Sequence, residues 1–178
     1  MKILPVPTKE FVMIYRINKI VGNIGQNTRD ICWLLFRIFI AAMFMTHGYD
    51  KLLGDNPQPF QGGGMTSVNI GDLISFPMPM DINALFLAGS IELVGGALIV
   101  IGLWTQLAAF IAALNMLMAY SIAHLAWFPT LNNGETAAMY FFSFLIIFSF
   151  GPGQLSLDAF FDNRRQEKKN KKMEEHGS

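Results

Sequence analysis

The stretch Ile82–Leu103, which reads INALFLAGSIELVGGALIVIGL, decides the fold class of this sequence. Between Asp81 and the end of the stretch, every residue is apolar or uncharged except Glu92, at its middle. An α-helix needs about 20 consecutive apolar residues to cross the hydrocarbon core of a bilayer. The stretch therefore predicts a membrane-spanning helix with one carboxyl group inside it.

Three further apolar stretches accompany it along the chain. Ile31–Thr46 continues to Leu52, Leu107–Phe128 comes after the quoted stretch, and Ala137–Phe150 is shorter but can be extended by Gly134–Thr136. Buried helices of soluble bundles usually carry a polar stripe, whereas the third stretch has few polar residues: Asn115, Tyr120, Ser121 and His124. We therefore predict an all-α polytopic membrane protein, a four-transmembrane-helix bundle.

Composition supports this class and excludes several others. The 178 residues are 52% hydrophobic and 15% charged, against roughly 25% charged in ordinary soluble domains. The formal net charge is zero, which disfavours nucleic acid as a partner. Cys32 is the only cysteine, so an intrachain disulfide, a Cys-x-x-Cys redox pair and a thiolate zinc site are excluded.

The positions of the cations predict the orientation of the bundle. No Lys or Arg occurs between Lys51 and Arg164. Five cations precede the first span and six follow the fourth: Lys2, Lys9, Arg16, Lys19 and Arg29, then Arg164, Arg165, Lys168, Lys169, Lys171 and Lys172. The positive-inside rule places both termini in the cytoplasm, as an even number of spans requires.

Three parts of the chain follow from these observations. Residues 1–29 form a cytoplasmic lead-in, 30–158 the membrane domain and 159–178 a basic cytoplasmic tail. Within the lead-in, polar Lys9, Arg16, Lys19 and Asn23 share one helical face, opposite an apolar face. This pattern is typical of an amphipathic helix that lies on a membrane surface; a solvated lead-in is the alternative.

One long segment, Leu53–Met80, connects the first two spans on the outer side. Its glycines and prolines exclude a regular helix, and its apolar residues favour a loop that folds back over the bundle as a lid. At the other end of the chain, Gly151–Gly153 is expected to stop the last span. Ser156 is expected to cap a short amphipathic helix that runs through Phe161.

Two ionisable residues inside the spans call for partners or roles, because each costs about 2.5–3.5 kcal/mol to insert. Depths estimated at about 1.5 Å per residue place Arg37 and Glu92 within a helical turn of each other. They are predicted to form an intramembrane ion pair. A functional alternative makes Glu92 a proton-handling carboxylate whose pKa Arg37 tunes.

A second polar cluster is expected near the outer surface, below the Gly62–Gly64 loop. It consists of His47 and Lys51 on the first span, His124 on the third and Glu135 at the start of the fourth. These side chains could hydrogen-bond the carbonyls of a quinone in a shared pocket. A b-type haem held by both histidines, or a metal ion bound by His47, His124 and Glu135, is disfavoured because the spacing specifies no metal.

Several pieces of the sequence, in order, resemble the DoxX family of small four-helix membrane proteins. They are Arg37 with Thr46–Leu52, then Glu92–Gly96, His124, Asn133–Glu135 and Gly151–Asp158. The inner link Trp104–Gln106 departs from the pattern, because relatives usually have a basic residue there. The basic tail is an extension.

The resemblance implies a place in a bacterial inner membrane and a redox-linked, quinone-proximal role, as a subunit of an oxidoreductase system in thiol, sulfur or oxidative stress metabolism. It implies other membrane or peripheral redox subunits as partners, besides the lipid bilayer. Whether the chain is itself an enzyme stays open. A non-catalytic scaffold or assembly subunit is one alternative, and a small-solute transporter is another; no internal repeat supports the transporter.

Overall fold

The computed structural model describes residues 9–70 and 74–176, so residues 1–8 of the expected lead-in, 71–73 of the expected loop and 177–178 of the tail lie outside the described residues. The described chain is almost entirely helical, with one small hairpin. Its elements are α1 (Lys9–Leu53), β1 (Ser67–Ile70), β2 (Ile74–Pro77), the 3₁₀ turn η1 (Pro79–Asp81), α2 (Ala84–Ser90), the π-helical η2 (Ile91–Gly95), α3 (Gly96–Ile101), α4 (Thr105–Ala123), the 3₁₀ turn η3 (Pro129–Asn132), α5 (Glu135–Phe150) and α6 (Leu157–His176).

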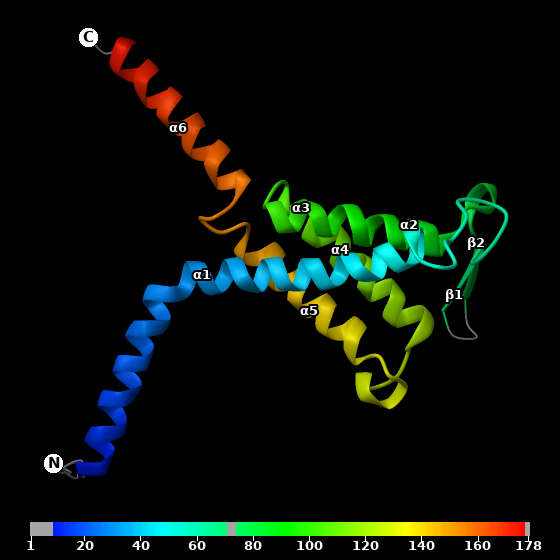
Figure 1. Cartoon of the computed structure of the whole chain (residues 1–178), viewed down its shortest axis with the longest axis horizontal. Coiled ribbons are helices and arrows are strands. Elements are labelled where there is room, and N and C mark those ends of the chain that lie inside the picture. The colour runs from blue at the N-terminus through cyan, green and yellow to red at the C-terminus, as the bar shows by residue number, and fades with distance from the viewer. Residues whose placement is uncertain (1–8, 71–73, 177–178) are drawn as a thin grey trace.

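α1, the continuous segment α2–η2–α3, α4 and α5 pack against one another in one bundle (Figure 1). Three of them are long and apolar enough to cross a membrane: Met13–Leu53, Ala84–Ile101 and Thr105–Ala123. The fourth, α5, is apolar but has 16 residues. A buried core of small and aromatic residues holds them together, including Ala41, Phe44, Ile99, Ala109, Ala112 and Phe144.

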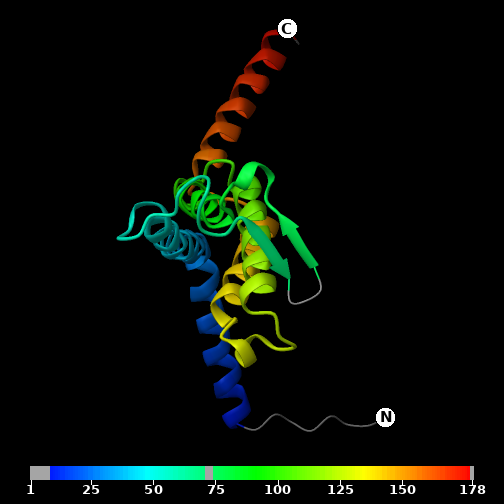
Figure 2. The ribbon, with the colours of Figure 1, turned by 90° about the vertical axis from the view of Figure 1, so that its right-hand side faces the viewer.

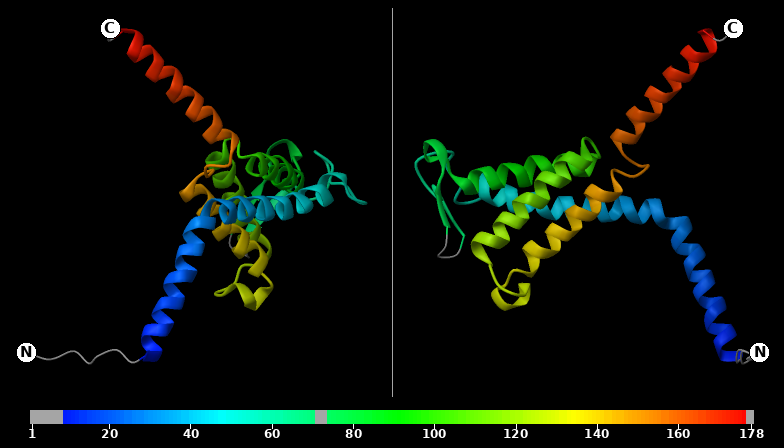
Figure 3. Two further views of the ribbon diagram at one scale, coloured as in Figure 1. Left: turned by 60° about the vertical axis from the view of Figure 1, so that its left-hand side comes forward. Right: turned by 180° about the vertical axis from the view of Figure 1, so that it is seen from behind.

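The first helix is much longer than a single span. α1 has 45 residues, roughly 68 Å at 1.5 Å per residue, against a hydrocarbon core of about 30 Å. Its N-terminal part leaves the bundle at an angle (Figure 3). The Thr28 hydroxyl donates to the Ile24 carbonyl at 2.9 Å, a back-bond that favours bending. The expected amphipathic lead-in is thus continuous with the first span.

The second span is interrupted by a wider turn that carries Glu92. α2 and α3 are α-helical, whereas Ile91–Gly95 between them is π-helical. A π turn inserts one extra residue into an α-helix, and such insertions are frequent at functional sites. Here it sets the carboxyl group of Glu92 at the helix surface that meets α1 and α4, two elements with which this turn is in contact.

Glycines bring the backbones of α1 and the second span close together. A Cβ placed on Gly48 would lie 2.6 Å from the backbone nitrogen of Leu93 and 2.7 Å from the Gly89 carbonyl oxygen. Further along the pair, a Cβ on Gly96 would lie 3.0 Å from the Ala41 carbonyl oxygen. Small residues at such positions allow membrane helices to pack closely. This contact fixes the register between the two helices.

A β-hairpin occupies the end of the bundle where α1 ends, within the segment for which the sequence predicts a lid loop (Figure 2). β1 and β2 pair antiparallel, with Val68 opposite Phe76. Buried Asn83 ties the hairpin to α2: its Oδ1 accepts from the backbone N–H groups of Met65 and Leu85, both at 3.0 Å. Its amide nitrogen donates to Gln58 and to the Pro59 carbonyl, so all its polar atoms are satisfied.

The opposite end is closed by the segment after α5. Gly151, with φ +78, ends α5 as expected. Asp158 accepts from the backbone N–H of Trp104 at 2.9 Å and from both the N–H and the hydroxyl of Thr105 at 3.0 Å. A carboxylate there satisfies free N–H groups at the start of α4 and suits the helix dipole.

Two expected boundaries are corrected. The Ser156 hydroxyl accepts from the Ala159 N–H at 3.1 Å as the expected cap, but α6 continues past Phe161 to His176. The third span ends at Ala123 rather than Phe128, because His124 has non-helical backbone angles. The short turn η3 then leads into α5.

We expect Gly48→Ala to destabilise the bundle and Gly95→Ala to leave it nearly unchanged. A Cβ on Gly48 collides with backbone atoms of the second span, which cannot move aside locally, whereas a Cβ on Gly95 meets nothing within 4 Å. Overpacking of this kind costs about 1–3 kcal/mol. Thermal unfolding of the two purified variants in the same detergent measures the difference. Equal midpoints would contradict the close helix contact.

Candidate functional site

A cavity of about 460 Å³ lies inside the bundle near the hairpin end. Residues of α1, the second span, α4 and α5 line it, and Met65, Val68 and Met78 line it from the hairpin region. Most of the wall is apolar. Its polar side chains are His47, Lys51, Glu92, Asn115, His124, Thr136 and Tyr140. This combination of an apolar wall and a few polar groups is typical of small-molecule sites.

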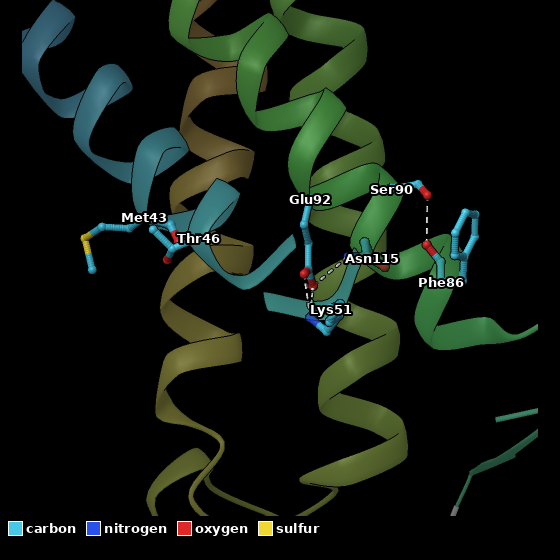
Figure 4. Close-up of polar contacts among 7 residues, drawn as sticks. All are labelled: Met43, Thr46, Lys51, Phe86, Ser90, Glu92 and Asn115. Atoms are coloured by element: carbon cyan, nitrogen blue, oxygen red, sulfur yellow. Dashed lines mark hydrogen bonds and ion pairs between the residues drawn. The ribbon is translucent and has the colours of Figure 1, made fainter. Parts of the chain in front are cut away.

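The strongest polar contact in the cavity wall is an ion pair between Lys51 and Glu92. The Lys51 ammonium lies 2.7 Å from one carboxylate oxygen of Glu92 and 2.5 Å from the other. The Asn115 amide, from α4, approaches the same carboxylate at 3.5 Å. Figure 4 shows Lys51 and Asn115 directed toward Glu92 from two helices. Three helices thus meet at one carboxylate.

The two members of this pair differ in their environment. The Glu92 side chain is 3% exposed and that of Lys51 is 30% exposed. A carboxylate without a counter-ion is expensive at such a depth, whereas a long lysine stem can carry its charge toward water. The charged form of Glu92 therefore depends on the ion pair more than the charged form of Lys51 does.

The two histidines line the same cavity from different elements. The His47 ring contacts the edge of Tyr140, with ring centroids 5.8 Å apart. His124 Nδ1 donates to the Asn132 carbonyl oxygen at 2.9 Å, since a carbonyl can only accept. This bond assigns the ring proton to Nδ1 and leaves Nε2 of neutral His124 as an acceptor.

Three of the four residues expected to converge in an outer pocket line this cavity: His47, Lys51 and His124. Glu135 does not. It is an exposed residue in the first turn of α5, where a carboxylate suits the helix dipole. The Gly62–Gly64 loop is not part of the lining either, because Gly64 packs against Asn83 and Gln58. Residues of the hairpin region take its place.

Within the described residues, no three His, Cys, Asp or Glu side chains are grouped closely enough to hold a metal ion. The arrangement of His47, His124 and Glu135 around a metal is therefore not assembled.

The expected Arg37–Glu92 ion pair is wrong. Among the described residues, Arg37 instead donates to the backbone carbonyls of Pro152 and Leu155, the latter at 2.8 Å. A Cβ on Gly102 would lie 2.9 Å from Arg37, so Arg37 is level with Gly102, ten residues beyond Glu92, or about 15 Å along the helix. α1 and the second span are therefore shifted further along each other than one expects from counting residues inward from the ends of their apolar stretches.

Two cavity residues were not singled out from the sequence. Asn115 is the one amide in the middle of an apolar span, a signal that could have placed it opposite Glu92. Tyr140 is 6% exposed, and its hydroxyl has no hydrogen-bond partner in the described part of the chain. It is the only tyrosine of α5, whose other aromatic residues are phenylalanines, but the burial of its hydroxyl cannot be read from that difference.

We expect Lys51→Met to destabilise the protein more than Glu92→Gln. The first change leaves a buried carboxylate unpaired, which costs about 3–5 kcal/mol or forces its protonation. The second leaves a partly exposed ammonium. The double variant should recover much of the loss, because both charges are removed together. Unfolding midpoints of the three variants in one detergent provide the check, and an equal loss in both single variants would argue against the pair.

Comparison with known proteins agrees with this architecture. The DoxX family model matches residues 32–125. A protein of Haemophilus influenzae named "Uncharacterized protein" is 38% identical over 130 residues, which cover 70% of this chain and 87% of the relative. No solved structure matches the chain. The matched region contains α1 from Cys32 onward, the hairpin, the second span and α4, and the chain therefore belongs to the DoxX family of membrane proteins.

Proposed function

We propose that this protein binds a quinone in the cavity beside Lys51 and Glu92 and serves as the quinone-proximal membrane subunit of an oxidoreductase system. The observation that carries the proposal is the cavity itself. Its wall is mostly apolar and its one ammonium is neutralised by its one carboxylate. An uncharged, flat, largely apolar ligand with hydrogen-bonding oxygens fits this wall better than an ion does.

The polar groups of the wall suit the carbonyl oxygens of a quinone. The Lys51 ammonium has donor capacity beyond its contact with Glu92, and the amide of Asn115 and the hydroxyl of Tyr140 are further donors. Reduction of a quinone to a quinol consumes two electrons and two protons. We assign proton delivery to the Glu92–Lys51 pair and the histidines. The electrons are assigned to a partner subunit that carries a redox cofactor.

The bundle is proposed to cross the membrane four times, with α5 as the fourth span. α5 packs along α4, and its two ends reach both ends of the bundle. Just before it, Gly134 packs against Tyr120 and His124; just after it, the Pro152 carbonyl accepts from Arg37. Because α5 extends as far along the bundle as α4 does, it is proposed to cross the same layer of the membrane.

We further propose that both termini face the cytoplasm of a bacterial inner membrane. α6 and the N-terminal part of α1 leave the bundle at the end opposite the hairpin (Figures 1 and 3). These two segments carry ten of the thirteen Lys and Arg residues of the chain, which favours the cytoplasmic side. The apolar residues of the N-terminal part, among them Met13, Ile17, Ile20 and Ile24, are each more than half exposed and are assigned to the surface of the cytoplasmic leaflet.

The orientation is tested with single cysteines in a Cys32→Ser background. In spheroplasts, a membrane-impermeant maleimide should label Ser67→Cys on β1, whereas Asn170→Cys on α6 should react only after permeabilisation. Both positions are exposed, so accessibility of the side chain does not bias the comparison. The reverse pattern would overturn the proposed orientation.

The quinone site is tested by filling the cavity without changing a charge. Ala88 lines the cavity, whereas Ala42 is exposed on α1 and does not line it. Wild-type protein and Ala42→Leu should retain extractable quinone through purification and bind a short-chain quinone afterwards; Ala88→Leu should lose both. Quinone retention by Ala88→Leu would refute the site. If the wild-type protein neither retains nor binds quinone, the scaffold alternative is favoured.

A further inference from the structure

A second cleft, of about 1090 Å³, lies at the other end of the bundle between α6 and the start of α4. Arg164, Arg165 and Lys168 line it, together with the carboxylates Asp158 and Asp162. Asp158 is already engaged by the backbone and side-chain donors at the start of α4. The three cations of the cleft therefore face one further carboxylate, Asp162, which does not take part in these bonds to the start of α4.

An apolar groove continues from this cleft along the outside of the bundle. The groove has a volume of about 360 Å³ and runs between the second span and α4. Val94, Gly95, Trp104 and Leu107 are among its lining residues. Trp104 and Leu107 line both the cleft and the groove, so the basic region and the apolar region form one continuous surface.

The exposed side chains of this surface match a membrane boundary. Trp104 is 66% exposed, and Val94 and Leu107 are each 60% exposed, which leaves a large apolar area uncovered by the chain itself. Tryptophan is enriched at the level of lipid headgroups. With the orientation proposed above, on which this inference rests, the cations of α6 lie on the headgroup side of Trp104 and the apolar groove lies on the hydrocarbon side.

We propose that this surface is a binding site for an anionic phospholipid. The phosphate is bound by Arg164, Arg165 and Lys168, and one acyl chain lies in the groove between the second span and α4. Guanidinium groups bind phosphate oxygens through two parallel hydrogen bonds. Basic pockets beside membrane helices at the cytoplasmic face bind anionic headgroups in the same way.

A lipid accounts for both halves of the surface. A free phosphate ion would use the cations but leave the groove empty, and an acidic protein segment would also have no use for an acyl-chain groove at membrane depth. The Arg164 guanidinium is held 4.5 Å from the centre of the Phe160 ring, which holds this cation against the first turns of α6.

The experiment compares two double variants of α6 that lose the same charge. Arg164→Gln/Lys168→Gln removes cations from the cleft, whereas Lys169→Gln/Lys171→Gln removes exposed cations that do not line it. Binding of phosphatidylglycerol and of phosphatidylcholine with the same acyl chains is measured by native mass spectrometry of the full-length protein. Wild type should prefer phosphatidylglycerol. The first variant should bind it roughly thirtyfold more weakly, at about 1 kcal/mol for each cation removed, and the second should match wild type.

A third variant separates a lipid from a free anion. A Cβ on Gly95 meets nothing within 4 Å, so Gly95→Leu can place its side chain in the groove; it should weaken binding of both lipids while the unfolding midpoint without lipid is retained. Equal loss in the two double variants would show diffuse charge attraction and overturn the site. Protection against unfolding by inorganic phosphate equal to that by phosphatidylglycerol, or no effect of Gly95→Leu on lipid binding, would overturn the lipid assignment.

Discussion

The close contact between α1 and the second span is the constraint on which the other features depend. Gly48 leaves no space for a side chain against the backbone of residues 89–93, so the two helices can pack at this distance in one register only. That register brings Lys51 to Glu92 at one end and Arg37 to Gly102 at the other. In a membrane, where apolar burial does not draw helices together, small residues and polar contacts supply this specificity.

The two buried charges on these helices are stabilised in different ways. Glu92 has a counter-ion and lies in the wall of a cavity. Arg37, also buried, donates to carbonyls that follow the end of α5, where helix termination leaves acceptors without partners. The first arrangement keeps polar groups available to a ligand, whereas the second closes the bundle. The motif residues Gly151–Asp158 therefore have a structural role: they receive Arg37 and cap α4.

The sequence predicts where the apolar helices of the bundle lie but neither all of their boundaries nor the stagger between them. Long apolar runs predict helix positions because the bilayer requires them, and His47, Lys51 and His124, which the sequence places at a similar depth, line one cavity. Arg37 was mispaired because depth was counted from the apolar ends, which ignores how far each helix extends beyond the membrane. The hairpin was missed because its strands have four residues each. Tyr140 was missed because burial of its hydroxyl depends on the packing of α5.

The hairpin region also contributes to the wall of the cavity. Met65, Val68 and Met78 line its hairpin end, whereas Leu87 and Met118, which line it as well, are 37% and 44% exposed. For the quinone proposed above, the exposed side chains of Leu87 and Met118 offer a route from the lipid, and a ligand that takes this route must first dissolve in the bilayer. Each methylene of its tail then adds about 0.8 kcal/mol to partition into the membrane. An apparent affinity measured from the aqueous phase thus contains the partition of the ligand into the bilayer as well as its binding in the cavity. A long isoprenoid or alkyl chain raises the concentration of the ligand's headgroup beside the bundle without contacting the cavity itself.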